Sequence, residues 1–250
     1  MPRPFLYLFN LYFYALFLAV SLTAMLLFTS YVVLLGILFP NRRRTMRRFR
    51  RAINWYGMLV VAAPSPFIKV RYEYQGDVAH GEPCIFVCNH RSATDAFLMG
   101  LLPEELVQIV NVWPFRIPLL GFYAKLSGYL NIRMMSPEKF MENGSRLIGE
   151  GVSVVFFPEG TRAVDRKMGS FHGSAFRLAL ATKAPIVPIC LSGTDVVMPK
   201  GSSLLYPGEV TLRRLPAIRW SEYGELTAFA LKNRVWKVID RELSLMEARA

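Results

Sequence analysis

The chain begins with an apolar stretch far longer than any other in the sequence. From Phe5 to Phe39 there are 35 consecutive residues without a charge. About 20 such residues cross a bilayer as a helix, so this stretch predicts a membrane segment. One straight helix of this length would measure roughly 52 Å against a hydrocarbon core of roughly 30 Å. The pattern therefore allows one long span or a re-entrant hairpin of two shorter helices, with Asn10 and the Thr29-Ser30 pair as possible breaks.

A basic block follows the apolar stretch. Seven arginines lie between Arg42 and Arg51, whereas only Arg3 and the amino terminus are basic on the other side. The positive-inside bias then places this block and everything after it on the cytoplasmic side of the cytoplasmic membrane. Arginines beside a bilayer attract anionic headgroups, which explains the block better than nucleic-acid binding does. Residues 1–40 are predicted to be a membrane anchor, and residues 41–66 a basic juxtamembrane segment.

From residue 67 to residue 250 short apolar runs alternate with helical stretches. This alternation predicts an α/β domain with a largely parallel central sheet flanked by helices. Strands are predicted at 67–74, 84–89, 107–112, 129–133, 152–157, 186–191 and 210–215, and helices at 93–102, 118–126, 137–150, 174–183 and 225–246. Strands 84–89, 152–157 and 186–191 are almost wholly apolar, which is typical of a sheet centre covered on both faces.

Composition narrows the class of partner and of site. The formal net charge of +12 favours an anionic partner, such as an anionic membrane or a phosphorylated substrate. The three cysteines, Cys84, Cys88 and Cys190, form no CxxC pair. Their odd number and spacing argue against a disulfide framework and against a metal site.

Polar residues follow the apolar strand 84–89. His90 stands at the strand tip, and a helix starting near Ser92 would place Asp95 in its first turn. A carboxylate there can accept a hydrogen bond from one imidazole nitrogen, which leaves the other nitrogen to act as a base. No protease-type nucleophile accompanies the pair, so a substrate hydroxyl would have to attack. The Ser92-x-x-Asp95 spacing is equally typical of a helix N-terminal cap, and one Asp could serve both roles.

Two other strand ends are expected at the same edge of the sheet, because parallel α/β sheets hold ligands at the carboxyl ends of their strands. The turn after strand 152–157 contains Gly160, which lets a backbone approach a ligand, and Arg162, whose guanidinium suits phosphate. An ordinary strand exit with a surface arginine is the alternative. Strand 186–191, with Pro188, is structural when taken alone. The sequence thus predicts that His90 and Arg162 share a pocket.

The three blocks together resemble the 1-acylglycerol-3-phosphate acyltransferase family, whose motifs are NHxxxxD, FPEGTR and VPI in that order. The resemblance runs from Lys69 to Thr194, about half of the chain. It implies that His90 deprotonates the acceptor hydroxyl for attack on an acyl thioester, and that Asp95 orients the imidazole. It also implies an acceptor-phosphate loop and a donor-side residue: Glu159, Gly160, Thr161 and Arg162 for the loop, and Pro188 for the donor side.

The reaction implied by the resemblance moves a fatty acyl group from acyl-CoA or acyl carrier protein to the sn-2 hydroxyl of 1-acylglycerol-3-phosphate or a related lysophospholipid. The product would be phosphatidic acid or the matching phospholipid, with no metal or bound cofactor. The second block departs from the family pattern, because Asn111 stands where a Lys is usual and no Asp-Arg pair follows Gly128. Arg116, Lys125 and Arg133 are candidates to supply the lost charge, which leaves the acceptor headgroup open. A non-catalytic lipid-binding protein on the same fold and a lipid hydrolase are the alternatives.

Overall fold

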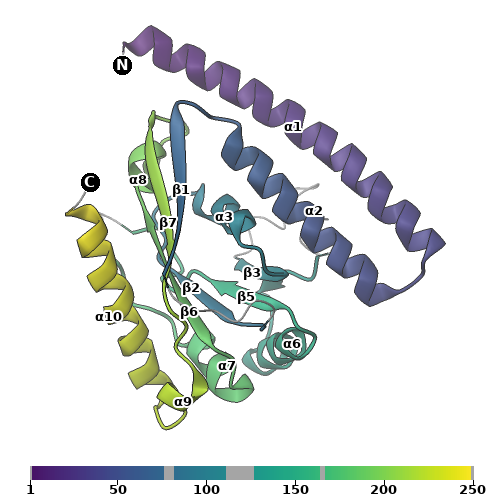
Figure 1. Cartoon of the computed structure of the whole chain (residues 1–250), viewed down its shortest axis with the longest axis vertical. Helices are drawn as coiled ribbons and strands as arrows, with labels where there is room; N and C mark the ends of the chain where they lie inside the picture. The colour runs from purple at the N-terminus through teal and green to yellow at the C-terminus, as the bar shows by residue number, and fades with distance from the viewer. Residues whose placement is uncertain (1, 76–81, 111–126, 164–166, 249–250) are drawn as a thin grey trace.

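A mostly parallel sheet forms the centre of the protein (Figure 1). The computed structural model describes residues 2–75, 82–110, 127–163 and 167–248. Within them a seven-stranded sheet has the order β1-β7-β6-β2-β5-β3-β4. The strands are β1 (Ile68–Tyr74), β2 (Ile85–Cys88), β3 (Leu106–Val110), β4 (Leu130–Asn131), β5 (Ser153–Phe156), β6 (Ile186–Ser192) and β7 (Gly208–Arg214). The predicted α/β class is confirmed.

The central strands all run the same way. Strand β2 pairs in parallel with β5 on one side and with β6 on the other, so the carboxyl ends of these three strands lie at one edge. Every residue of β2 and β5 is buried, as their continuous apolar runs predicted. Strands β6 and β7 pair in the antiparallel direction, and β1 then joins β7 in parallel. The sheet is therefore largely parallel, with one antiparallel junction.

Helices cover both faces of the sheet (Figure 1). On one face lie α6 (Pro137–Gly149), α7 (Ser174–Thr182) and α10 (Ala228–Glu247), the last preceded by the short α9 (Trp220–Tyr223). On the other face lie α1 (Arg3–Leu38), α2 (Arg42–Ala62), α3 (Asp95–Leu98) with a 3₁₀ turn at Met99–Leu101, and α8 (Thr194–Val197). The predicted helix 93–102 is thus much shorter than expected, and the predicted helix 118–126 lies outside the described residues.

The apolar stretch forms one continuous helix, α1, which shows no break at Asn10 or at Thr29. It lies alongside α2, where Ser21 and Tyr56 are joined by a 2.8 Å hydrogen bond between their hydroxyls (Figure 1). In the described part of the chain, α1 alone is long and apolar enough to cross a bilayer, by length and composition only. A signal sequence or a buried core helix can pass the same test.

The first third of α1 is docked on the α/β domain. Phe9, Asn10 and Phe13 are buried there, although they belong to the apolar stretch that predicted a membrane segment. The Asn10 amide donates to the carbonyl of Leu205 at 2.9 Å and accepts from the Leu205 N–H at 2.7 Å. Asn10 is therefore an attachment point between α1 and the domain, not a place where the helix ends.

The basic segment contains α2, a helix that the sequence pattern did not reveal. The Asn41 side chain caps it by accepting from the Arg44 N–H at 3.0 Å. Arg50 points inward, 4% exposed, and its guanidinium bonds Glu105 at 2.8 Å and the Ser127 carbonyl at 3.0 Å. At least one of the seven arginines therefore holds the fold together and does not face lipid.

Candidate active site

A histidine and a buried carboxylate meet at the carboxyl end of β2. His90 Nδ1 lies 2.8 Å from Asp95 Oδ2, and the imidazole is 23% exposed while the Asp95 side chain is fully buried. The same Asp95 oxygen accepts from the N–H groups of Arg91 at 2.7 Å and Ser92 at 2.8 Å. One Asp95 oxygen therefore both binds the backbone N–H groups just before the helix start and contacts the imidazole, as the two interpretations of the sequence required. A carboxylate at this nitrogen favours the tautomer that leaves Nε2 as the proton acceptor.

Neighbouring residues fix the loop that carries His90. The Asn89 side chain exchanges two hydrogen bonds with the backbone of Leu191, at 2.9 and 2.8 Å, and so joins the ends of β2 and β6. The Phe157 ring lies 4.8 Å from the imidazole, between ring centres, with an angle of 43° between the planes. The imidazole is therefore held on its carboxylate side and on one face.

Glu159 joins the His90 loop to the loop that follows β5. Its buried carboxylate accepts from the His90 N–H and from the Gly169 N–H, each at 2.7 Å. The Ala163 N–H in turn donates to the His90 carbonyl at 2.7 Å. Burial raises the pKa of Glu159, and the two backbone N–H bonds oppose that shift in part. The loops that carry His90 and Arg162 are therefore in direct contact. The pocket predicted to be shared by the imidazole and the guanidinium stays a prediction.

The turn after Glu159 is built on a glycine. Gly160 has φ +68°, and a Cβ at this position would lie 3.0 Å from Nε2 of His172. Backbone strain and the nearby imidazole both favour glycine here. Thr161 is exposed and Arg162 is partly exposed, and the Arg162 carbonyl accepts from the ammonium of Lys200 at 2.8 Å. Sequence reasoning had not assigned Lys200, because nothing near it in the chain marks it.

The remaining predicted site residues lie elsewhere. Pro188 is buried inside β6, where it is paired with Val87 of β2, and its carbonyl accepts from the Leu215 N–H at 3.0 Å. Its place is in the sheet below the site. Arg133 is exposed and follows β4, the edge strand, which is separated from β5 by β3. Lys125 lies outside the described residues.

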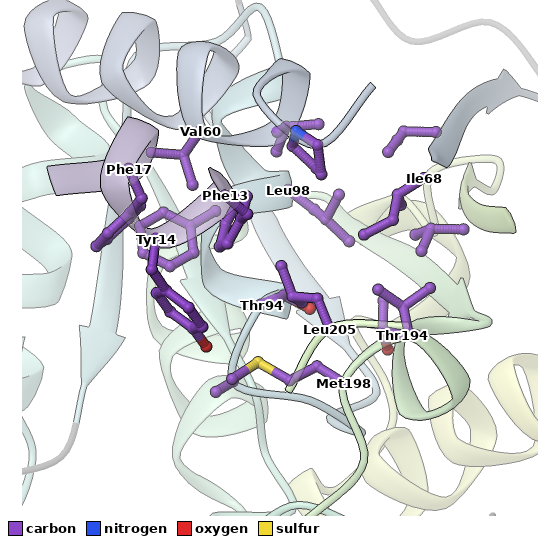
Figure 2. A pocket seen from close by; sticks show the side chains of 17 residues that line it. Phe13, Tyr14, Phe17, Val60, Ile68, Thr94, Leu98, Thr194, Met198 and Leu205 are labelled. Atoms are coloured by element: carbon purple, nitrogen blue, oxygen red, sulfur yellow. The ribbon is translucent and has the colours of Figure 1, made fainter. Parts of the chain in front are cut away.

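An apolar pocket of about 160 Å³ adjoins the loop of residues 90–95 (Figure 2). Ala93 and Thr94, which lie between His90 and Asp95 in the sequence, form part of its wall. Other walls come from α1, α2, α3, β1, β7 and α8 with the residue that follows it. Lining residues include Phe13, Phe17, Val60, Leu98, Met198 and Val210. No local signal announces this pocket, because its walls come from segments far apart in the sequence.

Arg91 connects the loop of residues 90–95 to helices on both faces of the sheet. Its side chain is 4% exposed, and its guanidinium pairs with Glu247 at the end of α10 and lies 3.8 Å from Asp195 of α8. Because the Arg91 backbone N–H also bonds Asp95, this ion-pair cluster fixes the loop that holds the imidazole–carboxylate pair.

The fold and this site are those of an acyltransferase domain, and the family model described as Acyltransferase matches residues 69–192. The 1-acyl-sn-glycerol-3-phosphate acyltransferase beta of Homo sapiens is 30% identical over 207 residues, which cover 80% of this chain and 73% of that protein. The chloroplastic 1-acyl-sn-glycerol-3-phosphate acyltransferase BAT2 of Brassica napus is 32% identical over 179 residues, 70% of this chain and 51% of that protein. The chain therefore belongs to the 1-acyl-sn-glycerol-3-phosphate acyltransferase family.

Two further comparisons set the scope of this likeness. The chain spans about half the length of several relatives, such as 57% of a Chlamydomonas reinhardtii protein of the same family, to which it is 33% identical over 193 residues. The crystal structure of the 1-acyl-sn-glycerophosphate acyltransferase PlsC from Thermotoga maritima has a TM-score of 0.81 and 23% identity, and the match covers 100% of this chain and 99% of that one. The latter likeness shows that the whole fold, including the N-terminal helix, is shared.

Proposed function

We propose that this protein transfers an acyl group from a thioester donor to the sn-2 hydroxyl of 1-acylglycerol-3-phosphate. The observation that carries the proposal is the 2.8 Å contact between His90 and Asp95, placed between an apolar pocket and a basic turn. The printed names of the relatives, 1-acyl-sn-glycerol-3-phosphate acyltransferases, supply the reaction. Acyl-CoA and acyl carrier protein are both suitable donors.

The chemistry requires one base and good positioning. His90 Nδ1–H donates to Asp95, so Nε2 removes the proton of the acceptor hydroxyl as its oxygen attacks the thioester carbonyl carbon. The new C–O bond forms and the C–S bond breaks. The departing thiolate takes the proton back from the imidazolium, which Asp95 stabilises in the meantime. The thioester is already activated, so no further cofactor takes part in the proposed steps.

The acceptor phosphate is assigned to the turn of residues 160–162. Arg162 supplies the guanidinium, and Thr161 offers a hydroxyl. Gly160 shapes the turn, and its own N–H donates to the Phe157 carbonyl at 3.1 Å. Glu159, included in this set on sequence grounds, is better placed as a support, because both carboxylate oxygens are occupied by backbone N–H groups. A carboxylate would also repel a phosphate. Arg133, at the edge strand, is not included.

The apolar pocket is assigned to the donor's acyl chain. Its lining is almost wholly hydrocarbon, and the residues between His90 and Asp95 form one wall. A chain lying there would leave its thioester carbon beside the imidazole. Burying the apolar chain stabilises the complex by about 0.8 kcal/mol per CH₂ group, so the pocket also selects for chain length.

We further propose that the protein works at the cytoplasmic face of a membrane, where its lipid substrate and product reside. Large apolar side chains of α1 beyond its docked part are exposed, including Leu22, Leu26 and Leu34. The exposed arginines are in the first half of α2. This half of α2 lies at the end of the helix pair where α1 ends (Figure 1). A row of cations beside an apolar surface is suited to anionic headgroups.

Product analysis tests the proposed function. The purified full chain is given labelled lysophosphatidic acid and other lysophospholipids, each with acyl-CoA and with acyl carrier protein. We expect phosphatidic acid, and a loss of at least about 100-fold in the His90→Ala variant because it lacks the base. Free fatty acid as the main product would establish hydrolysis. Full activity in a folded His90→Ala variant would exclude the imidazole from the reaction.

A further inference from the structure

The connection between α8 and β7, residues 198–207, contacts three functional parts of the molecule. Its Met198 carbonyl accepts from the Ser92 hydroxyl of the catalytic loop at 3.0 Å. Its Lys200 ammonium donates to the Arg162 carbonyl. Its Leu205 backbone exchanges two hydrogen bonds with Asn10 of α1. This α8–β7 connection therefore links the N-terminal helix to both catalytic loops.

Lys200 brings a second cation to the turn that holds Arg162. An ammonium has three N–H donors, and the 2.8 Å bond to the Arg162 carbonyl uses one of them. The side chain is exposed, and neither cation forms an ion pair with a carboxylate of the described residues. Lys200 thus combines a fixed position with donors that are available to a ligand.

The position of this ammonium relative to the apolar pocket points to a lipid phosphate. Met198, two residues before Lys200, lines the pocket that adjoins the catalytic loop (Figure 2). The first residue of the α8–β7 connection therefore borders hydrocarbon, and its third residue carries a cation bonded to the backbone of Arg162. A phosphate monoester carries about 1.5 to 2 negative charges near neutral pH, so one guanidinium alone leaves it incompletely neutralised.

We propose that Lys200 binds the phosphate of the lysophospholipid acceptor together with Arg162. This inference rests on the proposed function and adds to it a residue that determines headgroup specificity. Two cations on adjacent loops favour a phosphate monoester over a zwitterionic or uncharged headgroup, because the second cation adds affinity only where a second negative charge is present.

The same contacts assign a positioning role to Asn10. Its side chain, 4% exposed, pairs with Leu205 through both the N–H and the carbonyl, and the Tyr14 hydroxyl donates to the Ser203 carbonyl nearby. Through these bonds α1 fixes the α8–β7 connection and with it Lys200. The helix that meets the lipid therefore also places the cation that receives the lipid's phosphate.

The first experiment compares Lys200→Ala, Lys200→Arg and Lys139→Ala in the full chain. Lys139 is exposed on α6, which provides no residue of the site, so its variant removes the same charge elsewhere. Loss of one charge-assisted bond at an exposed site predicts an acceptor KM about tenfold higher in Lys200→Ala, with donor KM unchanged. Lys200→Arg and Lys139→Ala should stay within about threefold of the wild type. Equal rises in both KM values, or none, would overturn the proposal.

A binding measurement separates this inference from the proposed reaction. Calorimetry in neutral-detergent micelles measures the binding of lysophosphatidic acid and of monoacylglycerol, which lacks the phosphate. Lys200→Ala should weaken the first about tenfold and leave the second unchanged. If the wild type yields no phosphatidic acid yet shows this difference, the reaction is refuted and the Lys200 site stands. If phosphatidic acid forms and both ligands bind Lys200→Ala as they bind the wild type, only the Lys200 site is refuted.

A double-mutant cycle tests the link to α1. Asn10→Ala should raise acceptor KM several-fold in the wild type and have almost no effect in Lys200→Ala, because the two residues act on the same phosphate. Equal effects in both backgrounds would show that Asn10 does not act through Lys200. Thermal unfolding of each variant confirms that differences in KM are measured on folded protein.

Discussion

Replacing Asp95 by Asn separates the charge of this side chain from its shape. One carboxylate oxygen accepts three hydrogen bonds, from the imidazole of His90 and the backbone N–H groups of Arg91 and Ser92, all within 2.8 Å. The other oxygen is buried and has no hydrogen-bond partner among the described residues. An Asn can therefore place its carbonyl oxygen at the first position and its amino group at the second, where the amino group has no acceptor among the described residues.

The expected losses follow from the strength of these bonds. A hydrogen bond to a charged group contributes about 1.5–3 kcal/mol, against about 0.5–1.5 kcal/mol for a neutral pair. Losing the charge therefore costs about 1 kcal/mol per bond, or about 3 kcal/mol of folding free energy over the three. Only the bond to His90 strengthens as the imidazole becomes charged, so about 1–2 kcal/mol is lost from the transition state, or about 5- to 30-fold in kcat.

Steady-state kinetics on folded Asp95→Asn protein measures this loss. We expect kcat to fall while both KM values change little, and the fall should be smaller than that of His90→Ala, which loses the base itself. Asp95→Ala is the contrasting variant, because it leaves three donors without an acceptor in a fully buried place and should fail to fold stably. An Asp95→Asn protein with wild-type kcat would refute the claim that this charge supports the imidazolium.

Three further predictions concern the loops and the pocket. Burial raises the pKa of Glu159 above 4.5. The contribution of this group to stability is therefore fully present below its pKa in the unfolded chain, and is lost as pH rises through its pKa in the folded protein. The unfolding free energy of the wild type, relative to that of Glu159→Gln, should therefore be higher at about pH 4 than at about pH 7. The opposite trend in urea titrations would contradict the raised pKa. Gly160→Ala should cost about 1–2 kcal/mol in calorimetry, because φ is positive there, and an unchanged melting temperature would exclude that strain. Ala93→Leu should shift donor preference towards shorter acyl chains in a competition assay, since the larger side chain fills part of the pocket. An unchanged preference would show that the donor acyl chain does not bind in this pocket.

The parts of the site that could be predicted from sequence are those whose residues are close together in the chain, or follow neighbouring parallel strands. His90 and Asp95 are five residues apart on one strand-to-helix loop, so their contact is local. The turn at Gly160 follows from the strand before it, because parallel neighbours bring their carboxyl ends to the same edge. These two rules were enough to place His90 and the loop of Arg162 together.

What the sequence did not reveal depends on contacts between distant segments. Lys200 and Arg162 are 38 residues apart, and Asn10 and Leu205 are 195 apart. The helix α2 was concealed by its arginines, although Arg50 faces inward in the fold. The predicted helix 93–102 became short because its end is a 3₁₀ turn that packs closely on α2, where a Cβ at Gly100 would lie 2.8 Å from the Asn54 carbonyl.

The docking of α1 has a practical consequence for handling the protein. Phe13, Tyr14 and Phe17 form one wall of the apolar pocket, and the same helix secures the α8–β7 connection through Asn10. Deleting residues 1–38 to obtain a more soluble protein would open that pocket to water and release the connection. A shortened chain of this kind could keep its sheet and its histidine and still be a poor catalyst. Detergent or nanodisc preparations of the full chain are therefore the right material for inhibitor screening.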